Sequence, residues 1–335
     1  MTIIKNNKKI LRKFLFGCLL LFLAGPLNAS FTNPVSSIYS LELSLNPEYP
    51  VAHQTTSAQV ELYGLDIERY EISWFVNGIL KERKVGQTEF FFQVGDWGKT
   101  TTLTVQVNTP NNGLLTNQLS IIPVEADLIW EADTYTPPFY KGKAVNSSNA
   151  VINITALPNF VNSSGQKISA DKLIYKWTED SKVRGNQSGY GKKTISLEGP
   201  QTNRSKRITV EVQSMDGTLK AKKIISVRSQ SPQIIFYKED PLLGTLYNTA
   251  LKDEYNLIGE ELRVVAVPFF FSFQNETRYN WTMNNQSLDN NLDKDKIILR
   301  RPTDQTGQSK VALKIQNLDK ILQFTENDFL IKFEN

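Results

Sequence analysis

The sequence contains one cysteine and one histidine among its 335 residues, and these two scarcities exclude several kinds of chemistry. Cys18 lies near the N-terminus, so the rest of the chain has no disulfide bond and each domain must be stabilised by its own core. His53 stands without the second histidine or cysteine that a catalytic triad or a histidine-based metal site would need. The sequence therefore predicts no catalytic residue, no metal ligand and no cofactor.

Excess positive charge is also absent once the first residues are set apart. Five of the 38 basic residues lie between Lys5 and Lys13, which leaves 33 basic against 34 acidic residues, a net charge of −1. Without a global positive field the chain has nothing to attract a polyanion over its whole surface. We therefore exclude nucleic acid as a partner.

The N-terminus has the layout of a secretory signal peptide. The basic residues precede Phe14 to Leu27, 14 residues without a charge, and Ala29 offers a small residue for cleavage. A helix needs about 20 apolar residues to cross a membrane, so this stretch is short for a stable span. We expect residues 1–29 to form a signal helix that is removed, leaving a mature chain without a membrane span. A retained leader would tether the protein to the membrane.

An internal repeat sets the architecture. Three short segments each place an aromatic or aliphatic residue two positions before a tryptophan: Ile72-Ser73-Trp74, Tyr175-Lys176-Trp177 and Tyr279-Asn280-Trp281. The tryptophans lie 103 and 104 residues apart, and an alternating strand follows each of them with its middle residue 31, 33 or 32 positions later. These strands are Leu103-x-Val105-x-Val107, Ile208-x-Val210-x-Val212 and Val311-x-Leu313-x-Ile315.

Turn signals follow the alternating strand in two of the repeats. Asn112-Gly113 and Asp216-Gly217 are typical of tight hairpins, whereas Leu318-Asp319-Lys320 occupies the third position without a glycine. Short alternating strands in units of about 100 residues are typical of β-sandwiches. We expect Trp74, Trp177 and Trp281 to be the structural core of three such units, because one indole can bridge two sheets about 10 Å apart.

The Tyr-x-Trp strand, the Asn77-Gly78 turn and the later Val-x-Val strand resemble PKD-type and bacterial immunoglobulin-like domains. The segment 135–144, Tyr-Thr-Pro-Pro-Phe-Tyr-Lys-Gly-Lys-Ala, is similar to one found in secreted bacterial envelope proteins. The resemblance implies an all-β protein of three tandem immunoglobulin-like (PKD-like) β-sandwich domains after an N-terminal signal helix. The cysteine pair of antibody domains and the Gly-Asp-Gly turn of many PKD domains are absent.

The domain limits follow from the repeat. We expect a tether at 30–37, domain 1 at 38–123, domain 2 at 124–229 and domain 3 at 230–335. The strand ending at Ile121-Ile122 leads almost directly into the next domain, without a Gly/Ser-rich spacer. Adjacent domains therefore have little freedom to swing, and the sequence predicts a semi-rigid rod.

Two aromatic segments are candidates for binding. Tyr135, Phe139 and Tyr140 stand beside prolines and lysines, where exposed rings would stack on sugars or anchor a protein. The alternative is that these rings fill the end of the sandwich. Phe269-Phe270-Phe271-Ser272-Phe273 cannot turn every ring toward one core, because alternate side chains of a strand face opposite sides. We expect either an exposed interface patch or a loop that covers the rings.

Three patterns that suggest chemistry have simpler interpretations. Ser164-x-x-Lys167 and Ser169-x-x-Lys172 match a catalytic serine–lysine motif, but that motif requires a helix and both pairs lie in a polar loop. Asp289-x-Asn291-x-Asp293 begins like a calcium loop but lacks its glycine and its bidentate glutamate; a looser site would use Asp289, Asp293 and Asp295. A carboxylate pair for glycoside hydrolysis is not marked by any motif.

Together these features predict a non-catalytic exported protein, secreted or in the cell envelope, that serves as a spacer or as a docking or adhesion surface. Its partner would be a protein or glycan component of the envelope, and the chain would be a monomer or part of a larger assembly. The alternative function is a carbohydrate-binding module that uses Tyr135, Phe139 and Tyr140. A hydrolase with an unrecognised carboxylate pair is the third hypothesis.

Overall fold

The computed structural model describes residues 39–111, 113–162, 164–272, 277–288, 293–301 and 306–333. These residues form strands and three short 3-10 helices. The predicted signal peptide 1–29 and tether 30–37 lie outside the described residues. In the part of the chain that the structure covers, no helix has the length and apolar character needed to cross a membrane.

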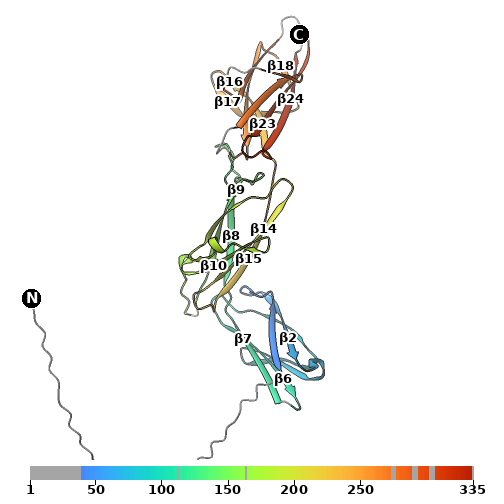
Figure 1. Ribbon diagram of the computed structural model, residues 1–335, viewed down its shortest axis with the longest axis vertical. Coiled ribbons are helices and arrows are strands. Elements are labelled where there is room, and N and C mark those ends of the chain that lie inside the picture. Colours follow the sequence, from blue (N-terminus) through green and yellow to red (C-terminus); the bar gives the residue numbers. More distant parts are fainter. Residues whose placement is uncertain are drawn as a thin grey trace, which may run out of the picture. The chain divides into compact units, whose positions relative to one another are not determined.

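The first sandwich consists of a three-stranded sheet, β1-β2-β5, packed on a four-stranded sheet, β4-β3-β6-β7 (Figure 1). Its inward side chains alternate with polar ones along each strand, as the sequence pattern requires. Its elements are β1 (Ser40–Asn46), β2 (Thr55–Tyr63), η1 (Ile67–Arg69), β3 (Glu71–Val76), β4 (Ile79–Val85), β5 (Glu89–Gln93), β6 (Thr101–Thr109) and β7 (Gly113–Ile121).

The second sandwich repeats this plan with the sheets β13-β9-β8 and β11-β10-β14-β15, and β12 also pairs with β10. In Figure 1, β14 and β15 run side by side, as their register requires. The elements are β8 (Glu125–Ala132), β9 (Val151–Asn159), η2 (Ala170–Lys172), β10 (Ile174–Glu179), β11 (Lys182–Val183), η3 (Gly185–Gln187), β12 (Gly189–Tyr190), β13 (Thr194–Glu198), β14 (Ser205–Gln213) and β15 (Lys220–Arg228).

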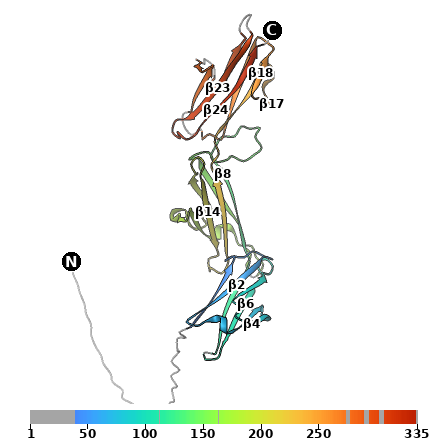
Figure 2. The same cartoon turned by 90° about the vertical axis from the view of Figure 1, so that its right-hand side faces the viewer.

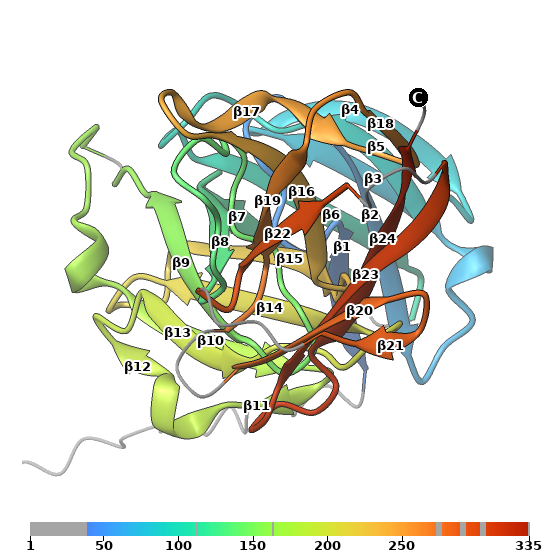
Figure 3. The same cartoon turned by 90° about the horizontal axis from the view of Figure 1, so that it is seen from above.

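The third sandwich has two strands, β17 and β18, that have no counterpart in the first. Its sheets are β17-β16-β19-β22 and β18-β24-β23-β20-β21, and β18 pairs in parallel with β24 (Figures 2 and 3). The elements are β16 (Gln233–Asp240), β17 (Gly244–Leu251), β18 (Glu254–Leu257), β19 (Glu261–Phe269), β20 (Thr277–Met283), β21 (Gln286–Ser287), β22 (Lys296–Arg300), β23 (Gly307–Asn317) and β24 (Phe324–Phe333).

One strand order is common to all three sandwiches. The sheets β1-β2-β5, β8-β9-β13 and β16-β19-β22 correspond, and each faces the sheet that joins the tryptophan strand to the last two long strands. This is the Greek-key arrangement of immunoglobulin-like domains. The prediction of three tandem immunoglobulin-like β-sandwiches is therefore confirmed, and we propose 38–123, 124–229 and 230–335 as their limits.

The three tryptophans occupy equivalent positions. Trp74 and Trp177 are fully buried and Trp281 is 2% exposed, each in the core of its own sandwich. Each indole N–H donates to the backbone carbonyl of a residue 13 or 15 positions later, in the loop before the next strand of the opposite sheet. The acceptors are Gln87 at 3.0 Å, Lys192 at 2.9 Å and Lys294 at 3.1 Å.

The backbone conformation of each final hairpin accounts for the residues found in its turn. Gly113 and Gly217 adopt φ of 75° and 69°, the left-handed region that glycine favours, and Asn112 lies outside the described residues. The third hairpin is a longer loop between Asn317 and Phe324. There the Asn317 side chain accepts from the backbone amides of Asp319 and Lys320, both at 3.0 Å. This side chain organises the turn, so no glycine is needed.

Candidate functional site: a sealed junction and the hollow beside it

The loop between β8 and β9 leaves the second sandwich and pairs with the third. The backbone N–H of Tyr135 donates to the carbonyl of Phe271, and the N–H of Phe270 donates to the carbonyl of Tyr135, both at 2.7 Å. Tyr135 thus bonds two successive residues, and Phe270 has φ of 64°, which is the pattern of a bulged backbone bridge. The loop therefore extends the third sandwich at the point where β19 ends.

Aromatic rings cover this bridge. Tyr140 contacts Phe269 and Phe270 edge-to-face, with ring centroids 5.7 Å apart in both pairs. Phe139 contacts Tyr237 at 5.9 Å and Phe269 at 6.2 Å. Edge-to-face pairs at these separations contribute about 0.5–1.5 kcal/mol beyond the burial of their area. We call these five residues the aromatic junction.

The phenylalanine run is buried from both sides. Phe271 faces the core of the third sandwich with no exposed area, whereas Phe269 and Phe270 face outward and are 5% and 6% exposed under the loop that contains Tyr140. The exposed-patch interpretation is therefore wrong for these three rings, and the covering loop is present. Phe273 lies outside the described residues.

A buried polar cluster lies next to the aromatic junction. The Gln323 side chain, fully buried, donates through Nε2 to the carbonyl of Ser148 at 2.8 Å and accepts through Oε1 from the amide of Ser272 at 3.0 Å. Asn317 donates through Nδ2 to the carbonyl of Ser272 at 2.8 Å, and Lys320 donates to the carbonyl of Asn149 at 2.8 Å. Because unmade hydrogen bonds are costly in a buried site, these bonds hold the two sandwiches in one arrangement.

The junction of the first and second sandwiches is built differently. Lys222 and Glu48 form an ion pair at 3.9 Å, a long and exposed contact. A hollow of about 950 Å³ lies beside it, with Leu43, Leu119 and Lys220 among the residues that line it. Surface ion pairs contribute roughly 0–1 kcal/mol, so this junction is held less firmly than the one at Gln323.

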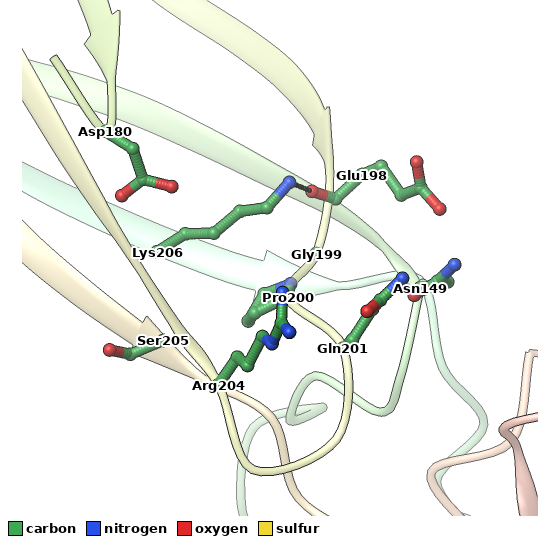
Figure 4. Close-up of a pocket in the computed structure, with 9 residues that line it drawn as sticks. All are labelled: Asn149, Asp180, Glu198, Gly199, Pro200, Gln201, Arg204, Ser205 and Lys206. Atoms are coloured by element: carbon green, nitrogen blue, oxygen red, sulfur yellow. Dashed lines mark hydrogen bonds between the residues drawn. The ribbon is translucent and has the colours of Figure 1, made fainter. Parts of the chain in front are cut away.

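A smaller hollow opens on the second sandwich, on the side of the Asn149 loop (Figure 4). Its volume is about 240 Å³, below the roughly 300–1,000 Å³ of most ligand pockets. Asp180 and Glu198 both line it, but Figure 4 shows the Glu198 carboxylate turned away, while the Lys206 ammonium donates to the Glu198 backbone carbonyl at 2.7 Å. The two carboxylates therefore do not face a common substrate position.

A buried carboxylate underlies this hollow. The Glu179 side chain is 6% exposed and forms ion pairs with Lys206, at 2.7 Å, and with Arg184. Burial by itself raises the pKa of Glu179, but the hydrogen bonds and charges of Lys206 and Arg184 outweigh it, so the net pKa is lowered. The carboxylate is therefore held in its ionised form between two cations. This arrangement stabilises the fold and supplies no proton donor.

The predicted binding residues are only partly accessible. Tyr135 and Phe139 are 37% and 36% exposed, and burial raises the pKa of Tyr135. Phe139 stacks on Tyr247 of the third sandwich at a centroid distance of 4.4 Å. The accessible rings of Tyr135, Phe139 and Tyr247 therefore belong to two sandwiches, at the aromatic junction.

The other patterns that suggested chemistry do not gather into a site. Ser164 and Lys167 lie in a loop, and the 3-10 helix at Lys172 is only three residues long. His53 lies in an exposed turn with Asp96 at 3.1 Å. Asp289 and Asn291 lie outside the described residues. Among the residues described, no group of three His, Cys, Asp or Glu side chains could hold a metal ion.

Sequence reasoning missed the buried polar cluster. Gln323, Asn317 and Ser272 carry no motif, and each acquires its role only through a contact with a distant segment. The one available signal was the glycine-free turn at Leu318-Asp319-Lys320, which needed an organising side chain.

No protein-family model matches the chain, and no curated protein sequence matches it. Several solved structures are similar. The three N-terminal domains of the bacteriophage RB49 highly immunogenic outer capsid protein are 12% identical over 89% of this chain and 99% of that one, with a TM-score of 0.26. The central fibronectin-III array of RIM-binding protein is 12% identical over 88% and 96%, with a TM-score of 0.29.

A third similar structure belongs to a 1.5-MDa bacterial ice-binding adhesin, in a study of its retention at the host cell surface. It is 11% identical over 88% of this chain and 98% of that one, with a TM-score of 0.22. At these values nothing about activity or partners follows from the similarity.

Proposed function

We propose that the protein is an exported component of a bacterial cell envelope, built from PKD-like or related immunoglobulin-like domains, that acts as a semi-rigid spacer with docking surfaces. The observation that carries the proposal is the sealed junction, where Gln323 bonds to Ser148 and Tyr135 pairs with Phe271. A spacer must transmit position from one domain to the next, and a hydrogen-bonded, ring-packed junction does so. The signal-peptide layout of residues 1–29 supports export.

The proposal is tested by distance measurements between spin labels on exposed positions of the second and third sandwiches, for example Lys182 and Asn256. We expect a narrow distance distribution, and a broader one for labels placed on the first and second sandwiches. Small-angle scattering should give an elongated monomer at low concentration. A compact, near-spherical particle, or a broad distribution across the Gln323 junction, contradicts the proposal.

A matched pair of variants distinguishes the loss of ring contacts at the junction from a general effect of removing two aromatic rings. Phe139→Ala with Tyr140→Ala removes rings that contact the third sandwich, so the distance distribution should broaden. Phe91→Ala with Tyr190→Ala removes two rings that are 63% and 57% exposed and should leave the distribution unchanged.

The second candidate function is a carbohydrate-binding module. It is favoured by the partly exposed rings of Tyr135, Phe139 and Tyr247, since sugars stack on such rings. A glycan array tests it: binding that is lost when Tyr135, Phe139 and Tyr140 become alanine supports it, and an array without binding removes it.

A further inference from the structure

The outer face of the first three-stranded sheet carries charge of one sign. Glu42 and Glu61 stand directly opposite each other on β1 and β2, and Glu89 lies on the adjacent β5. All three side chains are exposed, and among the described residues none has an ion-pair partner. No lysine or arginine occupies any outward position of these strands, which read Ser40, Glu42, Ser44, Asn46, Thr55, Ser57, Gln59, Glu61, Tyr63, Glu89, Phe91 and Gln93.

Like charges directly opposite each other destabilise a sheet, so this arrangement opposes the fold that contains it. Tyr63, 54% exposed, donates its hydroxyl to Glu61 at 3.1 Å, and hydrogen bonds to Glu42 and Glu61 raise its pKa. Phe91 adds a second exposed ring, 63% accessible. We call this surface the acidic face: three carboxylates around two aromatic rings.

The outer face of the larger sheet in the second sandwich has the opposite charge. Register places Lys176, Glu211 and Lys222 in one row, and Glu211 pairs with Lys176 at 3.0 Å. The exposed Val183 and Ile224 flank a row of threonines next to it. The outward basic residues of β10, β14 and β15 are Lys176, Arg207, Lys220, Lys222 and Arg228, against the single acidic Glu211. Lys222 also forms the long ion pair with Glu48 of the first sandwich, so Arg207, Lys220 and Arg228 are the members of this set without an ion-pair partner among the described residues. We call this surface the basic face.

Such segregation is not general in this chain. On the corresponding sheet of the third sandwich, Lys310 pairs with Asp328 at 3.3 Å and Lys332 pairs with Glu254 at 2.6 Å. Mixed signs in balance are the usual state of a protein surface, so an acidic face and a predominantly basic face on neighbouring sandwiches indicate a binding partner.

We infer that the partner is a second copy of this chain, with the acidic face of one copy docked on the basic face of the next. The chain itself supplies both surfaces, each of them a sheet face with charges arranged around exposed apolar side chains. Because the two faces lie on different sandwiches, the contact is head-to-tail, and a bound pair keeps one unused acidic face at one end and one unused basic face at the other. The assembly is therefore open-ended.

The size of the faces sets the strength of the contact. Two sheet faces of three or four strands bury an area at or below the low end of specific interfaces, on the order of 1,200 Å² in total. Self-association is therefore weak and depends on the charges. Raising the salt concentration from about 0.05 M to about 0.5 M shortens the Debye length well below 10 Å, and should weaken association by at least tenfold.

Sedimentation velocity of the purified protein at increasing concentration tests the inference. The expected result is a sedimentation coefficient that keeps rising with concentration at low salt and becomes constant at high salt. The acidic-face variant Glu42→Lys/Glu61→Lys/Glu89→Lys and the basic-face variant Arg207→Glu/Lys220→Glu/Arg228→Glu should each remain monomeric. All six positions are exposed, so both variants should keep the melting temperature of the parent.

Mixing the two variants gives the decisive result. The acidic-face variant then has two positive faces and the basic-face variant two negative ones, so together they should associate again although neither does so alone. A control with Lys81→Glu, Lys84→Glu and Lys99→Glu makes the same charge change away from both faces and should associate like the parent.

Three outcomes overturn the inference. One is a sedimentation coefficient that does not change with protein concentration at low salt. This result would also be obtained if the two faces met within one chain. Another is a mixture of the two variants that stays monomeric. The third is binding of a polyanion such as polyglutamate to the basic face in a protein that does not self-associate, which would assign that face to an acidic partner of another kind.

Discussion

Gln323 donates its side-chain amide to the backbone carbonyl of Ser148 at 2.8 Å, which joins two segments 175 residues apart in the sequence. The same side chain accepts from Ser272, so one fully buried residue links the loop after β8, the end of β19 and the last hairpin. This one side chain thus bonds to segments on both sides of the junction, and its removal should weaken the third sandwich as well as the junction.

Gln323→Ala should destabilise the third sandwich and loosen the junction. The substitution leaves the Ser148 carbonyl and the Ser272 amide without their partner in a buried site, at a cost of about 1–3 kcal/mol each before relaxation. Denaturant unfolding monitored by tryptophan fluorescence measures the loss. Gln59→Ala, on an exposed outward position, is the control and should change the unfolding free energy by less than about 0.5 kcal/mol. Equal effects of the two substitutions would contradict the role given to Gln323.

Trp177→Phe should destabilise the second sandwich by about 2–4 kcal/mol, because it removes buried ring area and leaves the Lys192 carbonyl without its donor. Trp74→Phe and Trp281→Phe should have effects of similar size on their own sandwiches, since their N–H groups make the same bond. Thermal unfolding of the three variants gives the comparison. Trp97→Phe, 37% exposed, is the neutral control. Widely unequal losses would show that the three positions are not equivalent.

Gly199→Ala should destabilise the loop that borders the smaller hollow. A Cβ at Gly199 would lie 2.8 Å from the carbonyl oxygen of Ala150 and closer still to Oδ1 of the buried Asn146. Overpacking of this kind typically costs about 1–3 kcal/mol. Gly185→Ala is the matched control, because no atom lies within 4 Å of its added Cβ. Equal melting temperatures of the two variants would contradict the close approach.

The ion pairs of Glu179 should make the second sandwich sensitive to acid. Because the pKa of Glu179 is lowered in the folded state, its contribution to stability is complete above the unfolded pKa of about 4.3. It is lost as the pH falls through the lowered folded value. Glu179→Gln should be less stable than the parent at neutral pH, and the difference should shrink below about pH 4. An unfolding series from pH 7 to pH 2 measures it. A difference that stays constant over that range would show that the carboxylate charge is not involved.

The sequence predicted the parts of this structure that repeat. Three tryptophan strands at nearly constant spacing and three later alternating strands specify the same sandwich three times, because local alternation decides which side chains face inward. The turn glycines followed for the same reason. All of these features depend on residues close together in the sequence, or on the comparison of one repeat with the next.

The junction could not be predicted in this way. The outward rings of Phe269 and Phe270 gave two acceptable interpretations, and the sequence offered no means to choose, since the covering ring of Tyr140 lies 129 positions earlier. For Tyr135, Phe139 and Tyr140 the sequence predicts either a binding segment or rings that fill the end of the sandwich, and neither interpretation includes their contacts with the third sandwich. Contacts between domains follow no sequence period, so only the three-dimensional arrangement reveals them.

The loop after β8 is synthesised before the third sandwich that it covers. Ser148 and Tyr140 emerge during synthesis well before Gln323 and Phe270, so the second sandwich completes its sheets while its loop still lacks a surface to cover. During that interval the rings of Phe139 and Tyr140 face water. Aggregation and chaperone binding should therefore concentrate in chains truncated just before the third sandwich, and disappear once its last strand is present.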